Sequence, residues 1–149
     1  YKVMNTLTEN GAVKRGICQE KNGYLTSLIE SNVLMNNGVI EASPLDGTMA
    51  FTVSKDTLVS MNMFLFTPYI FEILDKDIKE FFADKTDLDK KEFLIPDVVF
   101  NNIKKDNVKV KVLDTDGKWY GVTYKEDKDN VCQKIKELVD TGVYPEKLW

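Results

Sequence analysis

Residues 12–30 read AVKRGICQEKNGYLTSLIE, and this stretch decides the fold. Two runs that favour extended backbone, residues 12–20 and 24–30, flank the turn that contains Asn22 and Gly23. Asn-Gly is the strongest short-range signal for a two-residue hairpin, because both residues tolerate a positive φ. The sequence therefore predicts a hairpin of two antiparallel strands here.

Further strands are predicted along the chain. Residues 32–55 contain many turn-forming residues, which predicts an irregular segment with two short strands. Residues 58–66 are nearly all apolar, which predicts a strand buried on both faces. Valine and lysine alternate over residues 107–113, which predicts a strand with one wet face, and a turn leads from it to an extended run over 119–122.

Three helices are predicted. Apolar residues at helical spacing indicate a helix over 68–83, with Thr67 as its N-cap and Pro68 at its first position. A second helix is predicted over 97–105. The third is predicted over 127–141, with Gly142 as its stop. Strands and helices mix without regular repetition, so we expect an α/β or mixed α+β fold in a single domain over 1–149.

Composition and charge exclude some classes of partner. The chain is 43% hydrophobic and 30% charged, which is ordinary for a globular protein. Its net charge is −4 and its lysines are interleaved with acids, which argues against a nucleic-acid-binding surface. No apolar run reaches the ~18 residues of a membrane span, so we expect no membrane partner.

Cysteine and histidine usage limits the chemistry. Cys18 and Cys132 are too few and too isolated for a disulfide framework or a zinc site. Their apolar neighbours predict buried free thiols and a reducing, cytoplasmic setting. The sequence contains no histidine, which excludes histidine-based triads and imidazole acid–base catalysis within this chain.

Four residues near the hairpin and the apolar run are candidates for binding. Ser60 and Asn62 share one face of the predicted strand, where they either bond to neighbouring backbone or form the floor of a polar pocket. Glu30 is either a solvated carboxylate or an acceptor for sugar hydroxyls. Gly16 marks either a bulge or a close approach of backbone to a ligand.

A further cluster, residues 119–127, joins a predicted strand to the last helix. Ligands gather at the carboxyl ends of strands in open α/β sheets. The alternative is a simple helix cap, with Asp127 or Glu126 beside the positive end of that helix. The sequence leaves both interpretations open.

Several segments occur in an order that is shared with a known family: residues 15–18 (RGIC), 22–23 (NG), 27–30 (SLIE), 59–64 (VSMNMF), 92–98 (EFLIPDV), 109–112 (KVKV) and 121–124 (GVTY). In these segments the chain resembles the C-terminal half of the sugar-phosphate nucleotidyltransferases, also called sugar-nucleotide pyrophosphorylases. The ending, residues 119–127 and 142–146, resembles a bacterial branch of uncharacterised members.

The resemblance implies a fold and a reaction. The fold would be the C-terminal part of a three-layer α/β/α structure, a mixed sheet with flanking helices. A sugar-1-phosphate would attack the α-phosphorus of a nucleoside triphosphate, with Mg²⁺ as cofactor, to give an NDP-sugar and diphosphate. The family's nucleotide-binding N-terminal half, with its Gly-rich loop, is not part of this sequence, so we expect no catalysis by this chain alone.

The resemblance also assigns residues. It implies that Gly16, Glu30, Ser60 and Asn62 bind the sugar. It implies that Thr123 and Asp127 ligate the metal.

The sequence also departs from the family's pattern. Ser31 stands where many members place a lysine for the sugar phosphate, and Gly121 where thymidylyltransferases place a metal-binding aspartate. Asn62 replaces a glycine that is common on the central strand. These departures keep an alternative open, a non-catalytic module that senses sugar phosphates or binds a protein. We further expect an exposed apolar surface facing the missing N-terminal half, with a homo-oligomer as a result.

Overall fold

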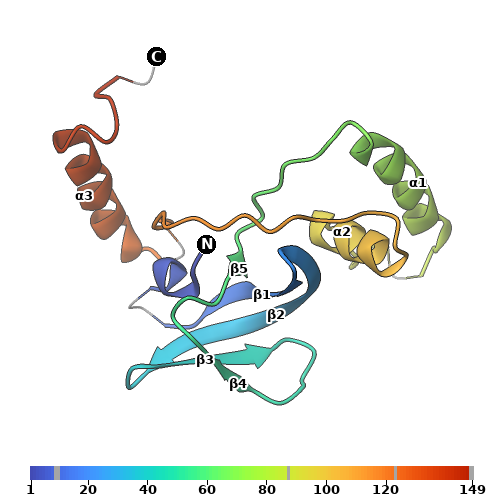
Figure 1. Cartoon of the computed structure of the whole chain (residues 1–149), viewed down its shortest axis with the longest axis horizontal. Coiled ribbons are helices and arrows are strands. Elements are labelled where there is room, and N and C mark those ends of the chain that lie inside the picture. The colour runs from blue at the N-terminus through green and yellow to red at the C-terminus, as the bar shows by residue number, and fades with distance from the viewer. Residues whose placement is uncertain (9–10, 87, 123, 148–149) are drawn as a thin grey trace.

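The computed structural model describes residues 1–8, 11–86, 88–122 and 124–147 (Figure 1). Its elements in chain order are the 3₁₀-helix η1 (Val3–Thr6), the strands β1 (Val13–Lys21), β2 (Tyr24–Asn36), β3 (Val39–Pro44), β4 (Phe51–Val53) and β5 (Val59–Ser60), and the helices α1 (Ile70–Ala83), α2 (Ile95–Lys104) and α3 (Asp127–Asp140). The mixed α+β class is confirmed.

The strands form one sheet in the order β4-β3-β2-β1-β5. Every pairing between the described strands is antiparallel, whereas the resemblance implied a mixed sheet. Short connections explain this, because a two-residue turn can join only antiparallel neighbours. The predicted hairpin is confirmed, and Asn22 and Gly23 adopt φ of 55° and 79° at its turn.

The two short strands predicted within residues 32–55 are confirmed as β3 and β4, but the segment before them is more regular than predicted. β2 continues to Asn36, and a second Asn-Gly turn leads into β3, with φ of 49° at Asn37 and 83° at Gly38. β2 buries every second residue here, which is the pattern of a strand with one face on the core. The frequent turn residues therefore connect regular strands.

The core lies on one face of the sheet. Side chains from η1 and from four strands form it: Val3, Val13, Ile17, Val33, Ile40, Ala42 and Val59. Because side chains alternate along a strand, the residues between them point to the opposite face. That second face carries the candidate site.

The apolar run is not the buried strand that was predicted. Only Val59–Ser60 pairs with β1, at the edge of the sheet. Asn62 then turns the chain with a φ of 54°, and Met63 and Leu65 are 80% and 96% exposed. Hydrophobicity alone predicted a central strand, but no described strand lies on the outer side of this segment.

The first two helices are confirmed within two residues at each end. α1 begins later than predicted because the chain first makes a tight turn, in which the amide of Ile70 donates to the Thr67 carbonyl. Thr67 is therefore not the N-cap, a position that Tyr69 takes without a side-chain bond. The two helices meet through Asn102, whose amide donates to Asp77 at 2.8 Å.

The segment between α2 and α3 is not the pair of strands that was predicted over 107–113 and 119–122. In the described chain it makes one isolated bridge, between Lys111 and Tyr24. The backbone of Val112 donates to Gly23 at 2.9 Å, so the segment lies against the tip of the first hairpin. The Val/Lys alternation is present, but residues 107–113 contact only the end of the sheet, at the hairpin tip.

α3 is confirmed, and Gly142 with a φ of 73° ends it. Figure 1 shows it standing apart from the sheet, on the side opposite to α1 and α2. Its predicted inner face is only partly covered, and Ile135 remains 39% exposed. Cys132 on this helix is exposed, so the prediction that it is buried is wrong. None of the described helices is long and apolar enough to span a bilayer.

Candidate functional site

Three of the four predicted binding residues lie in one row across the sheet. Gly16 of β1 is paired with Glu30 of β2 on one side and with Ser60 of β5 on the other. Residues paired in register share a face, so all three face away from the core. The fourth, Asn62, lies beyond the end of β5 and is exposed.

A bulge fixes this row. The register between β1 and β2 shifts between Gln19 and Glu20, so that Gln19 pairs with Ser27 and not with Thr26. Without that shift, the two-residue turn would place Glu30 opposite Arg15, on the core face. The bulge that one interpretation of Gly16 expected therefore lies elsewhere, at Thr26 of β2 opposite the step from Gln19 to Glu20.

The side chains around Gly16 leave no room for a larger residue at this position. A Cβ atom on residue 16 would overlap the Leu28 side chain and would lie 2.9 Å from Glu30 Oε1. Leu28 and Glu30 thus close over the glycine from the adjacent strand. The space above its backbone is filled by this chain's own side chains, and the Glu30 carboxylate is the charged group of the row.

The Glu30 carboxylate is placed to accept hydrogen bonds. Its side chain receives no hydrogen bond from the residues that the structure describes. Partial burial, and secondarily the negative charge of Asp97 on α2, raise its pKa above the usual value. A hydrogen bond from a hydroxyl group would offset the effects of burial and of the Asp97 charge, since it stabilises the ionised carboxylate.

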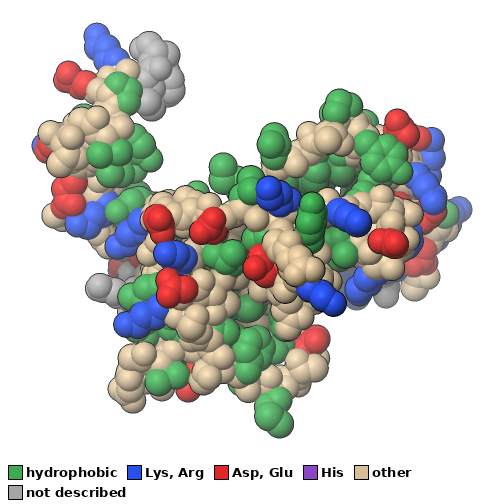
Figure 2. Space-filling view, viewed as in Figure 1, with side chains coloured by type: hydrophobic (Ala, Val, Ile, Leu, Met, Phe, Trp, Pro, Cys, Tyr) green, Lys and Arg blue, Asp and Glu red, His purple; other side chains and the backbone are tan. Residues whose placement is uncertain are grey.

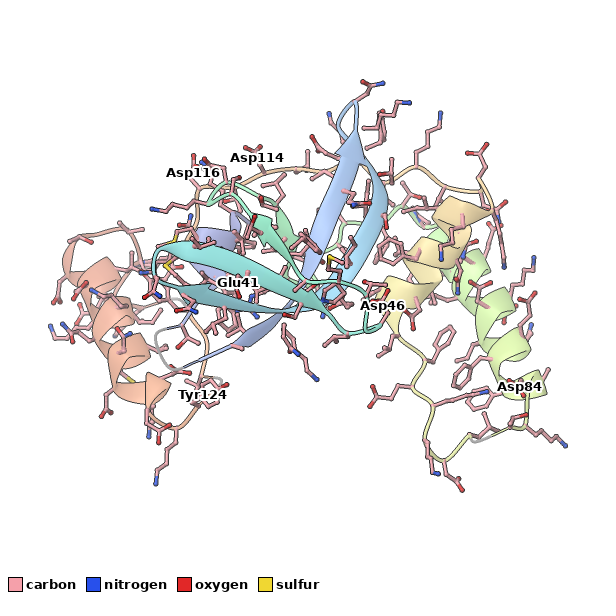
Figure 3. The ribbon with its side chains drawn as sticks, turned by 90° about the horizontal axis from the view of Figure 1, so that it is seen from below. Glu41, Asp46, Asp84, Asp114, Asp116 and Tyr124 are labelled. Carbon is pink, nitrogen blue, oxygen red and sulfur yellow. The ribbon has the colours of Figure 1, made fainter. Side chains whose placement is uncertain are left out.

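An open hollow of about 500 Å³ adjoins Glu30. It exists because β3 ends at Pro44, which leaves the edge of β2 bare from Ser27 to Ile29. The last bond between these strands runs from the Leu45 amide to the Glu30 carbonyl at 2.8 Å. Asp46 also lines the hollow, and Figure 3 shows it at the end of the sheet that faces α2.

The charges around this row favour hydroxyls over phosphate at the hollow. Glu30 and Asp46 are the charged residues that line it, and both are acidic. The nearest cation on this face by register is Lys14, which pairs with Asn32 one step along β1 from Gly16.

Ser60 and Asn62 contact each other. The backbone amide of Asn62 donates to Ser60 Oγ at 3.4 Å, which is the neighbouring-backbone bond that one interpretation of the sequence expected. Ser60 keeps its place in the row, whereas the positive φ of Asn62 takes it out of the strand.

Cys18 follows Gly16 on the same face and is only partly exposed. Burial is the main reason why its pKa is raised to about 11, so it is a protonated thiol at neutral pH. A thiolate nucleophile is the reactive form of cysteine, and this environment disfavours it. Cys18 is a packing residue of the site.

The proposed metal ligands do not assemble a metal site here. Thr123 lies outside the described residues. Asp127 is buried, and its carboxylate accepts a hydrogen bond from Thr8 Oγ1 at 3.1 Å and one from the Tyr124 amide at 2.8 Å. Asp127 is the first residue of α3, so its carboxylate lies beside the positive end of that helix, as the alternative interpretation expected. No group of three or more Asp, Glu, Cys or His that could hold a metal occurs in the described parts of the chain.

Sequence reasoning missed a cluster beneath the row, on the core face. Arg15 is 8% exposed; its Nε donates to Thr6 Oγ1 at 3.1 Å, and its Nη2 donates to the Thr6 carbonyl. Its guanidinium lies 4.9 Å from the centre of the Trp119 ring, and burial lowers its pKa. Arg15 is the only arginine in a sequence rich in lysine, which is the signal that could have revealed it.

Two comparisons with known proteins complete the description of the site. No protein-family model matches this chain. A search of the curated proteins likewise found no match to it.

Proposed function

We propose that this chain binds a sugar-1-phosphate, as the C-terminal half of a nucleotidyltransferase that forms an NDP-sugar. The observation that supports this best is the row of Ser60, Gly16 and Glu30, which brings together three of the residues that the family resemblance assigns to the sugar. The open hollow beside Glu30 gives the sugar ring a place to lie.

In this proposal the residues of the chain bind and orient the sugar. Glu30 accepts hydrogen bonds from two hydroxyls, and Ser60 Oγ donates or accepts one more. Lys14 faces the phosphate across the row. These contacts hold the sugar-1-phosphate so that its oxygen can attack the α-phosphorus of a nucleoside triphosphate and displace diphosphate.

The rest of the machinery belongs to the proposed N-terminal half. That half would bind the nucleoside triphosphate and complete a three-layer α/β/α fold in a cytoplasmic enzyme. Mg²⁺ would neutralise charge on the phosphates. Among the residues that the structure describes, no cluster of three or more acidic or other metal-ligating side chains could hold Mg²⁺, so we derive no step through the metal.

The test is calorimetric titration of the chain with glucose-1-phosphate, and with other hexose-1-phosphates in turn. Glu30→Gln should weaken binding about ten- to a hundredfold, because a charged hydrogen bond is lost. The matched control is Glu41→Gln, which removes the same charge from the same sheet face one strand away (Figure 3). Lys14→Met should weaken binding of the sugar phosphate but not of the free sugar. Equal affinities for wild type and Glu30→Gln would refute the proposal.

A second candidate function is a non-catalytic module that senses sugar phosphates. Two observations favour it. Asp127 is buried and hydrogen-bonded within the chain, and the ring of Trp119 occupies the space that a carboxylate on residue 121 would need. A sensor and an enzyme half would use the same binding site. An assay for nucleotidyl transfer by the longer protein distinguishes the two functions.

A further inference from the structure

The outer edge of β2 is paired on both sides of the hollow but not beside it. On one side β3 covers this edge, and the last contact is the bond from the Leu45 amide to the Glu30 carbonyl. On the other side the segment after α2 takes over, and the Leu25 amide donates to the Val110 carbonyl at 2.8 Å. Both neighbours run antiparallel to β2. The edge therefore has a break opposite residues 27–29, between two segments that run in the same direction.

Local geometry at each end produces this break. After β3 the chain turns away: the Gly47 amide donates to the Pro44 carbonyl at 3.3 Å, and Gly47 has a φ of 80°. At the other end, Thr26 is the residue that bulges out of the register between β1 and β2. A bulge shifts by one the residues whose backbone groups point outward, so the pairing at Leu25 does not continue in register past Thr26.

Leu28 presents unpaired backbone groups at the break. Backbone hydrogen bonds alternate between the two sides of an antiparallel strand. The Glu30 carbonyl points to the outer side, where it accepts from Leu45, so the groups of Leu28 point the same way. The opposed residue on β1 agrees with this, because the Cys18 amide donates to the Leu58 carbonyl on the far side of β1. Among the described residues, no backbone group bonds to Leu28 from the outer side.

A donor and an acceptor on one residue of an extended edge match the backbone of another strand. One residue of an added antiparallel strand satisfies both groups of Leu28, and its two neighbours then lie opposite Ser27 and Ile29. Opposed residues on paired strands share a face. The side chain of the central residue therefore lies on the face that carries Glu30, and its neighbours lie on the face of Ile29.

Charge indicates which peptide fits. Glu30 and Asp46 are the charged residues that line the hollow, and Asp97 adds a further negative charge near Glu30. By contrast, Figure 2 shows charged side chains of both signs interspersed on the face in view. A lysine or arginine opposite Leu28 is diagonal to Glu30, a separation that a long side chain can span. Apolar residues before and after it match Ile29.

We propose that the break in the β2 edge is a docking site for an extended peptide that carries a basic residue between two apolar ones. The peptide adds to β2 as a short antiparallel strand. This partner goes beyond the sugar phosphate proposed above. One consequence rests on that proposed function: because both ligands use the hollow beside Glu30, a bound peptide excludes the sugar.

The first experiment is an NMR titration of the chain, without sugar, with the acetylated and amidated peptide Thr-Val-Lys-Val-Thr. Hydrogen exchange of the Leu28 amide should slow as the peptide saturates the chain, because this amide gains an acceptor. The Ile29 amide is the internal control, since it faces β1 and its exchange should not change. A Leu28 amide that exchanges equally fast with and without the peptide would overturn the inference.

Peptide variants separate backbone pairing from charge. Methylating the backbone nitrogen of the peptide's lysine removes the donor to the Leu28 carbonyl and should weaken binding at least about fivefold. Methylating the next valine is the matched control, because that nitrogen faces away from β2, and the affinity should not change. Replacing the lysine by glutamate should weaken binding at least about tenfold, since it brings a carboxylate toward Glu30. Equal effects of the two methylations, or equal affinities of the lysine and glutamate peptides, would refute docking of this kind.

Competition distinguishes this inference from the proposed function. Glucose-1-phosphate should displace the bound peptide. Peptide binding that the sugar phosphate does not disturb would support the docking site and count against the proposed sugar site alone. Sugar binding by a chain that does not bind the peptide would overturn the docking site alone.

Discussion

The indole ring of Trp119 folds back over Gly121, so that a Cβ atom on residue 121 would overlap the ring. The same ring covers the guanidinium of Arg15. A glycine two residues after the tryptophan thus lets the connecting segment press its ring onto the buried cation beneath the candidate site.

Gly121→Ala should therefore displace the Trp119 ring and lower the free energy of unfolding by about 1–3 kcal/mol, the usual cost of overpacking. Urea denaturation measures the loss. Tryptophan emission should shift to the red, and Trp149→Phe removes the second tryptophan from the signal. Gly117→Ala is the control, because its Cβ would lie 3.2 Å from Thr115 Oγ1 and 3.6 Å from the Tyr1 ring. Unchanged emission from Gly121→Ala would contradict the packing described here.

Gly16→Ala should also destabilise the fold, by about 1–3 kcal/mol, because the new methyl group meets the side chains of Leu28 and Glu30. The double variant Gly16→Ala/Leu28→Ala should recover part of that loss, since truncating Leu28 makes room for the methyl group. A double-mutant cycle from chemical denaturation measures this coupling. Strictly additive losses would mean that the two side chains do not compete for the same space.

Asp127→Asn tests the anchor of α3. The variant loses the charge that accepts hydrogen bonds from Thr8 and Tyr124, which should cost about 0.5–2 kcal/mol of local stability. Hydrogen exchange of the α3 amides should accelerate accordingly. Asp129→Asn removes an equal charge from the same helical turn at an exposed position, so it isolates the contribution of the hydrogen bonds. Equal acceleration in both variants would assign the effect to the helix dipole.

The raised pKa of Glu30 predicts a pH dependence of stability. Above the unfolded pKa of a glutamate, the folded chain holds the Glu30 proton more tightly than the unfolded chain does. Glu30 therefore makes stability fall as the pH rises from about 4 through the folded pKa. Glu30→Gln removes this fall, so the variant should gain stability relative to wild type between about pH 4 and pH 7. Urea unfolding at several pH values measures this difference, and parallel curves for the two proteins would contradict it.

Local signals predicted the local structure of this chain. Turn residues and helical spacing predicted the first hairpin, α1, α2 and α3. These signals involve only residues that lie within a few positions of each other in the sequence. The strands predicted over 58–66 and 107–113 depended on neighbours that a hydrophobic pattern does not specify. The first lies mostly beyond the sheet edge, and the second only bridges to Tyr24.

Three of the six residues predicted for the site lie together in one row, but their geometry could not be predicted from the sequence. Gly16, Glu30 and Ser60 share a face because one residue bulges out near Thr26, whose hydroxyl donates to the Gln19 carbonyl at 3.1 Å. Nothing in the local sequence demands a bulge at that position. A shift of one residue decides whether Glu30 points to the core or to solvent, so the site depends on a feature that only the folded sheet reveals.

The two Asn-Gly turns have a consequence for the order in which the chain folds. They join β1, β2 and β3 through contacts between residues near in sequence, which close quickly and with a small loss of chain entropy. In contrast, the side chain of Asn5 donates to the Asp116 carbonyl across 111 positions of sequence. We expect the three-stranded meander to form first and to serve as the template on which η1 and the segment around Asp116 later settle.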